Sequence, residues 1–156
     1  MVKKVLTLLL VLVSINCFSS PRDVQGYEIR IDEILPIGYQ LAQENKEGAH
    51  TVFIFEESGK LESDNQVNIQ FSIENGKFGI DWVLRAPRNI EEKTKFVEFA
   101  KSKGYKVELR KMNGVSYYRV EEGGSLFTLV NLVITELYGI KKEAPVGLVA
   151  SGISFK

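Results

Sequence analysis

Residues 67–84 read VNIQFSIENGKFGIDWVL, and this stretch predicts a β-hairpin. Its Asn75-Gly76 pair lies between two segments of alternating polarity, and Asn-Gly favours a type I′ turn because both central residues need positive φ. A two-residue loop here sets apolar residues opposite one another on one face, in the pairs Ile73–Phe78, Phe71–Ile80, Ile69–Trp82 and Val67–Leu84. The other face pairs Glu74 with Lys77, Gln70 with Asp81 and Gln66 with Arg85. A shift of one residue would expose the whole apolar set, so the pattern also predicts the register.

A second hairpin is predicted around Asn113-Gly114 by the same turn chemistry. A two-residue loop there sets opposite charges or apolar groups across from one another, in the pairs Glu108–Arg119, Lys106–Glu121, Leu109–Tyr118 and Val107–Val120. Cross-strand pairs of these kinds stabilise a sheet. A fifth strand is expected at 51–56, where residues 52–55 are apolar on both faces, which is typical of a covered strand.

Helices are indicated by their end signals. Asn89 followed by Glu92 is a capping-box pattern, and with a stop at Gly104 it predicts a helix over 90–103. Ser125 is a candidate cap for a mostly buried helix over 126–138. An earlier helix is expected over 32–45, provided that Pro36 falls in or beside its first turn.

These elements predict a single α+β domain over 27–156: a five-stranded antiparallel sheet with helices on one face, in the order α-β-β-β-α-β-β-α. The alternative is a ferredoxin-like plait, in which the apolar tail at 146–150 adds a last strand. The two topologies differ in whether this tail pairs inside the sheet.

Composition excludes several classes of function. The 156 residues carry 20 basic and 20 acidic side chains and no basic block, so the chain lacks the clustered cations that a nucleic-acid binder needs. One Cys excludes an internal disulfide, and one His excludes His-rich zinc sites. We expect no metal and no cofactor.

The first residues are typical of an export signal. Lys3 and Lys4 precede an apolar run at 5–13, which is too short to span a bilayer. The run is followed by VSINC at 13–17, which resembles a bacterial lipobox although Ser14 and Asn16 depart from the usual residues. We therefore expect a signal peptide at 1–16, acylation of Cys17, a tether at 17–26 and attachment to a membrane of the cell envelope. The alternative is plain secretion, with cleavage after Ser19 or Ser20.

The order of elements over 28–139, with the string DWVLRAPRN at 81–89 and the turn NGV at 113–115, resembles type III secretion chaperones and the YbjN-like proteins that share their fold. The resemblance implies a module that binds protein partners or forms a homodimer, and it carries over no catalytic residues. An export signal departs from this pattern, because secretion chaperones work in the cytoplasm.

Isolated polar groups favour structural roles. His50 has no second His and no Cys nucleophile beside it, so we interpret it as a strand-end residue. The adjacent pairs Glu56-Glu57 and Glu121-Glu122 point to opposite faces of a strand, whereas paired acid/base catalysis needs both carboxylates on one side. The segment at 123–125 is interpreted as a helix cap rather than an anion site.

One cluster remains as a candidate binding face, because strand alternation places its side chains on the side of the sheet away from the helices. It comprises Gln66, Asn68, Gln70, Asp81, Arg85, Arg110, Tyr117 and Arg119. The leading hypothesis is a non-enzymatic protein-binding or chaperone-like module, with another protein or a second copy as partner. The alternative is a periplasmic inhibitor or immunity-like protein, which an acidic patch at 56–64 would favour. An enzyme using Asp81, Arg85 and Arg119 would require a deep pocket.

Overall fold

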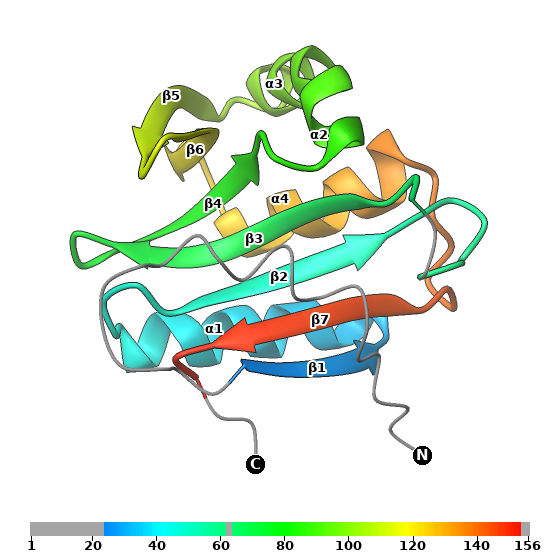
Figure 1. The fold of residues 1–156 in the computed structure, drawn as a ribbon, viewed down its shortest axis with the longest axis horizontal. Helices are drawn as coiled ribbons and strands as arrows, with labels where there is room; N and C mark the ends of the chain where they lie inside the picture. The colour runs from blue at the N-terminus through cyan, green and yellow to red at the C-terminus, as the bar shows by residue number, and fades with distance from the viewer. Residues whose placement is uncertain (1–23, 62–63, 154–156) are drawn as a thin grey trace.

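The computed structural model describes residues 24–61 and 64–153, which form one antiparallel sheet with helices against one face (Figure 1). The strands are β1 (Val24–Ile29), β2 (His50–Phe55), β3 (Val67–Glu74), β4 (Lys77–Val83), β5 (Lys106–Met112), β6 (Val115–Glu122) and β7 (Val146–Ser151). The helices are α1 (Ile34–Glu44), α2 (Pro87–Glu91), α3 (Lys93–Ser102) and α4 (Leu126–Leu132), with a 3₁₀ turn, η3 (Ile31–Glu33), before α1 and a π-helical segment, η4 (Val133–Leu137), after α4.

The predicted signal peptide at 1–16 and Cys17 lie outside the described residues. Residues 24–26, at the end of the predicted tether, belong to β1.

The α+β class is confirmed, but the predicted five-stranded sheet and its element order are wrong. The sheet has seven strands in the order β1-β7-β2-β3-β4-β6-β5, and a strand is both the first and the last element of the described residues. The tail does pair inside the sheet, between β1 and β2, but β2 and β3 separate it from β4. The ferredoxin-like alternative is therefore wrong as well.

The two extra strands depend on long-range pairing. Both neighbours of β7 pair with it in antiparallel fashion, so β1 and β2 run parallel and the connection through α1 leaves a gap between them. The last strand fills this gap, and all six of its residues are buried. The sequence of β1, VQGYEI, contains a Gly and little alternation, so pairing with β7 rather than local propensity makes it a strand.

Both predicted hairpins are present. Asn75 and Asn113 have φ values of 53° and 50°, as the two-residue turns require. In the first hairpin, Ile73 pairs with Phe78 and Phe71 with Ile80, as predicted. The ladder ends at Gln70–Asp81, however, so the predicted pairs Ile69–Trp82, Val67–Leu84 and Gln66–Arg85 lie beyond it. In the second, Glu108–Arg119, Leu109–Tyr118 and Val107–Val120 are confirmed, but Lys106 pairs with Glu122 because a register shift lies between Lys106 and Val107.

The helices cover the face of the sheet that carries the main apolar core. Helix α1 contacts β2 and β3, α2 contacts β3 and β4, α3 contacts β5, and α4 contacts β4 and β6. Aromatic rings dominate this core: Trp82 stacks on Phe96 with centroids 4.7 Å apart, and Phe71 meets Phe53 edge to face at 5.3 Å. Gly38 of α1 leaves room for the rings of Phe71 and Phe127, which an added Cβ would meet at 2.7 Å.

The predicted helix over 90–103 is instead two segments, α2 and α3, and α2 begins at Pro87 after Ala86. Asn89 is therefore inside a helix and is not its cap. Its buried side-chain amide bonds the backbone of Asn68: the N–H of Asn68 donates to Asn89 Oδ1 at 3.1 Å, and Asn89 Nδ2 donates to the carbonyl of Asn68 at 2.8 Å. The Trp82 indole donates to the carbonyl of Asn89 at 2.9 Å. Asn89 thus continues the pairing of β3 where its ladder with β4 has ended.

Replacing Asn89 with Ala should lower the free energy of unfolding by about 2–4 kcal/mol, because two buried backbone groups of Asn68 lose their partner. Urea unfolding followed by tryptophan fluorescence measures this change. The matched control is Glu91→Ala on the exposed side of the same helix, for which a change within about 0.5 kcal/mol is expected. Equal losses in the two variants would contradict the role given to Asn89.

Candidate functional site

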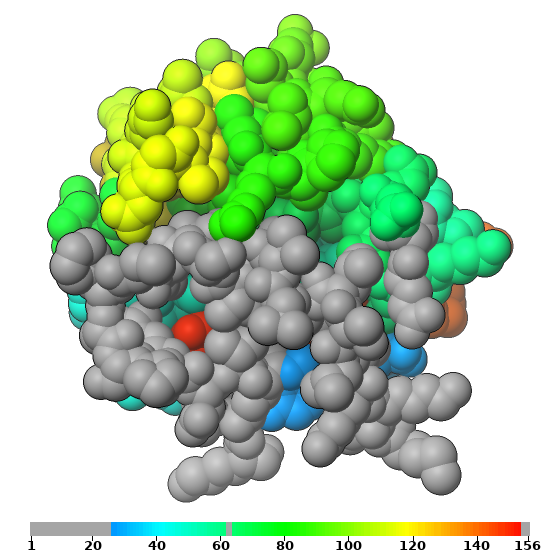
Figure 2. Space-filling view, viewed as in Figure 1, coloured from blue at the N-terminus to red at the C-terminus, as the bar shows by residue number. Residues whose placement is uncertain are grey.

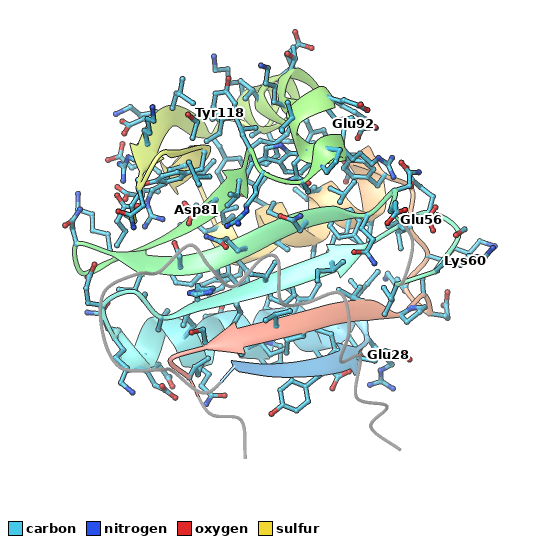
Figure 3. The ribbon with its side chains drawn as sticks, viewed as in Figure 1. Glu28, Glu56, Lys60, Asp81, Glu92 and Tyr118 are labelled. Carbon is cyan, nitrogen blue, oxygen red and sulfur yellow. The ribbon has the colours of Figure 1, made fainter. Side chains whose placement is uncertain are left out.

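The polar face is the part of the sheet over β3–β6 on the side away from the helices. Over β2 and β7 the same side carries a small buried apolar cluster of Val52, Ile54 and Val149. Of the eight residues predicted for it, Asn68, Gln70, Asp81, Arg110, Tyr117 and Arg119 occupy alternate positions of β3, β4, β5 and β6. The ladder sets Asp81 between Gln70 and Arg119, and sets Arg110 opposite Tyr117. Gln66 directly precedes β3, and Arg85 follows the end of β4, outside the cluster around Asp81. Figure 3 shows Asp81 over the middle of this part of the sheet.

Asp81 and Arg119 form the centre of the polar face, and they are 3% and 1% exposed. Arg119 Nη1 lies 2.7 Å from Asp81 Oδ1 and 2.7 Å from the hydroxyl oxygen of Ser72. The other carboxylate oxygen, Asp81 Oδ2, accepts from Ser72 at 2.5 Å and from Gln70 Nε2 at 2.9 Å. Both oxygens of Asp81 are therefore engaged. Burial opposes the charge on Arg119, but Asp81 and Glu121 outweigh it and raise the pKa of the guanidinium.

A second layer of ion pairs extends from this centre toward β5. Arg119 Nε lies 2.6 Å from Glu121, and Arg110 Nη1 bridges Glu121 at 3.0 Å and Glu74 at 3.1 Å. Arg110 Nη2 lies 3.0 Å from Glu108. Burial opposes the charge of Glu121, yet the two guanidinium groups lower the pKa of its carboxyl. At the rim, Lys106 and then Arg110 lower the pKa of Glu108 to about 2.

Tyr117 closes the network. Its hydroxyl donates to Glu74 Oε2 at 2.9 Å, and burial together with this carboxylate raises the pKa of the phenol well above its usual value. The tyrosine is therefore a neutral hydrogen-bond donor at physiological pH.

The predicted binding face left out four members of this network, namely Ser72, Glu74, Gly79 and Glu121, although the hairpin register had already placed Glu74 on this face. Three of them could have been found from alternation alone, because Ser72 and Glu74 are two and four residues beyond Gln70, and Glu121 is two beyond Arg119. Gly79 carried a weaker signal, a lone Gly inside a strand. Its missing side chain lets Arg119 cross β4, since an added Cβ would lie 2.6 Å from the guanidinium carbon. Arg119 Nη2 then reaches the carbonyl of Lys77 at 2.9 Å.

A shallow hollow lies at the β5 end of the polar face. It has a cavity volume of only about 10 Å³ and is lined by Lys106, Glu108, Arg110, Arg119, Glu121 and Glu122. Three cations and three carboxylates balance its charge. Pockets that enclose a small-molecule ligand are roughly 300–1,000 Å³ and mostly apolar. The hollow is therefore too small and too polar to enclose such a ligand, and its lining offers hydrogen-bonding groups at the surface instead.

The other candidate groups are engaged in local structure. His50 is buried at the start of β2, with Nδ1 3.2 Å from the carbonyl oxygen of Gly48. In the acidic stretch at 56–64, Glu56 accepts from the backbone N–H of Ser58 at 3.2 Å, and Glu57 forms an ion pair with Arg88. Residues 62–63 lie outside the described part. Ser125 caps α4 by accepting from the N–H of Thr128 at 3.4 Å.

Comparisons with protein-family models, with curated proteins and with solved structures found no match to this chain. No relative therefore tests the resemblance to type III secretion chaperones, and it stays a prediction. No helix among residues 24–61 and 64–153 is long and apolar enough to cross a membrane.

Replacing Glu121 with Gln should lower the free energy of unfolding at pH 7 by about 1–3 kcal/mol, because Arg119 and Arg110 lose a charged acceptor. The pKa of Glu121 is lowered in the folded state, so its contribution is present above the ordinary value of 4.5 and is lost as pH falls through the lowered value. Unfolding free energy measured from pH 7 to pH 3 should therefore decline less steeply in Glu121→Gln than in the wild type.

The matched control is Glu122→Gln, the same change on the next residue, which is exposed. We expect it to cost less at pH 7. A Glu121→Gln variant with wild-type stability and a wild-type pH profile would show that this ion pair contributes nothing.

Proposed function

We propose that this chain is an exported protein, anchored to a membrane of the cell envelope by lipid on Cys17, and that its domain binds a protein partner, either another protein or a second copy of this chain, without catalysing a reaction. Support for export and acylation comes from the leader, with its two lysines, short apolar run and Cys17. Support for protein binding comes from the β5 end of the sheet.

The observation that supports the proposal of protein binding is the exposed edge of β5. This strand is last in the sheet and pairs with β6 alone among the described strands. Its outer edge therefore offers backbone N–H and C=O groups to an added strand. Two of the four exposed large apolar side chains of the described residues, Leu109 and Met112, belong to this strand, and Leu109 is 62% exposed. Figure 2 shows the yellow atoms of the β5–β6 region at the upper left of the molecule.

The polar hollow adds a second kind of contact to this edge. Glu108 and Arg110 alternate with Leu109 along β5, and their side chains are 42% and 27% exposed. A strand added to β5 would meet backbone groups along its length, Leu109 on one face, and this pair of charges on the other. A buried apolar contact with hydrogen bonds around it is the usual composition of a protein interface.

The chemistry around Asp81 favours a structural role over catalysis. A general base must be free to accept a proton, whereas both oxygens of Asp81 already accept from Arg119, Ser72 and Gln70. The inhibitor alternative requires an acidic patch at 56–64 that can bind a partner. The first two carboxylates of this stretch, Glu56 and Glu57, instead bind Ser58 and Arg88 of the same chain.

Lipid attachment is tested by metabolic labelling with a palmitate analogue. The wild-type chain should take up label and partition with membranes, and Cys17→Ala should lose both, because the acyl chain is joined through Cys17. Cys17→Ser is a more conservative second variant and should behave in the same way. Label that persists in both variants, or a wild-type chain without label, would contradict acylation at this residue.

Protein binding at β5 is tested by photo-crosslinking in intact cells. A benzoylphenylalanine in place of Leu109 should give discrete adducts with a protein, because its ring lies at the proposed contact. The matched control places the same group at Ile90, which is also exposed but belongs to α2. Adducts from neither position, or the same adducts from both, would overturn the proposal.

A further inference from the structure

We infer that the partner of the β5 edge is a second copy of this chain, which adds antiparallel to β5 about a two-fold axis at Leu109. This inference rests on the proposed function, that the β5 edge binds protein, and it names the partner. The two copies would form one continuous sheet with both sets of helices on the same side.

The backbone of β5 suits this arrangement. Its two-residue turn makes Met112–Val115 the first hydrogen-bonded pair of the hairpin, and the pairs along an antiparallel ladder then alternate. The N–H and C=O groups of Val107, Leu109 and Lys111 therefore point away from β6, toward the open edge. A two-fold axis at Leu109 joins the two Leu109 residues as a hydrogen-bonded pair, and joins Val107 of each copy to Lys111 of the other.

The charges of β5 select the same register. Glu108 and Arg110 flank Leu109 symmetrically, so pairing about Leu109 sets Glu108 of each copy opposite Arg110 of the other. Residues directly opposite one another in an antiparallel pair lie on the same face of the sheet. The helices of both copies therefore lie on one side only when a residue pairs with the same residue of the other copy. With the axis at residue 108, Glu108 of one copy would lie opposite Glu108 of the other. With the axis at residue 110, Arg110 would lie opposite Arg110. Of the registers that centre on these three residues, only that at Leu109 pairs unlike charges.

The apolar side chains agree with the charges. On the helix side of the sheet, Leu109 pairs with Tyr118 of β6, which packs partly buried against the core. Figure 3 shows Tyr118 within the β5–β6 part of the molecule. Joining the two Leu109 side chains would make a stripe of Tyr118, Leu109, Leu109 and Tyr118 across both copies. This contact would cover the most exposed of the large apolar side chains in the described residues.

The test measures the mass of the full chain in detergent by sedimentation, for the wild type and four variants. The wild type should be a dimer. Leu109→Arg should be a monomer, because two cations would then meet at the axis, while Ile90→Arg, the same change at an exposed site on α2, should remain a dimer. Glu108→Arg and Arg110→Glu should each weaken the dimer by roughly tenfold or more, because each sets like charges opposite one another.

Mixing gives the sharpest result. In an equimolar mixture of Glu108→Arg and Arg110→Glu, one copy carries two cations and the other two anions, so heterodimers should form at concentrations too low for either variant alone to form homodimers. Loss of folding cannot produce this rescue. A wild-type dimer that all the variants leave intact, or a mixture that stays monomeric, would overturn the inference. A monomeric wild type whose residue 109 still crosslinks to a different protein would overturn it and leave the proposed function standing, and a chain that shows neither would refute both.

Discussion

The left-handed backbone of Asn75 and Gly76 fixes how β3 pairs with β4, and both faces of the sheet depend on this pairing. On one face it gathers Phe71, Ile73 and Ile80 beneath the helices. On the other it brings Gln70 and Asp81 together, in reach of Arg119 from the next strand. Because side chains alternate along a strand, a slip of one residue would exchange the two sets, burying carboxylates in the core. The turn therefore sets the core and the polar face together.

The polar face shows what a buried charge requires. Arg119 is removed from water, and this is costly unless the guanidinium is paired and hydrogen-bonded. Asp81, Glu121, Ser72 and the carbonyl of Lys77 supply these bonds, and Gly79 leaves the space in which they form. A network satisfied in this way is rigid, and it supports the β5–β6 hairpin against β4. This network therefore holds the β5–β6 hairpin, at the edge of the sheet, in one fixed position.

Part of the candidate site could be read from the amino-acid order. Alternation correctly assigned Asp81, Arg110, Tyr117 and Arg119 to one face, because the pleat leaves no choice once the hairpins are known. The bonds among them could not be read in the same way. Arg119 meets Ser72 across 47 positions of sequence, and Arg110 meets Glu74 across 36. Such contacts depend on which strand lies beside which, and nothing near either residue in the chain encodes that choice.

Separation along the sequence also divides the features that local chemistry determines from those that depend on tertiary structure. The two Asn-Gly turns, the strands that flank them and the capping of α4 by Ser125 follow from residues close together in the chain, whose conformations are restricted by sterics and short hydrogen bonds. The positions of β1 and β7, and the use of Asn89 to bond the backbone of Asn68, were decided by tertiary structure. Residue 146 finds its partner at residue 29, and at that separation the burial of apolar surface, rather than any local preference, selects the pair.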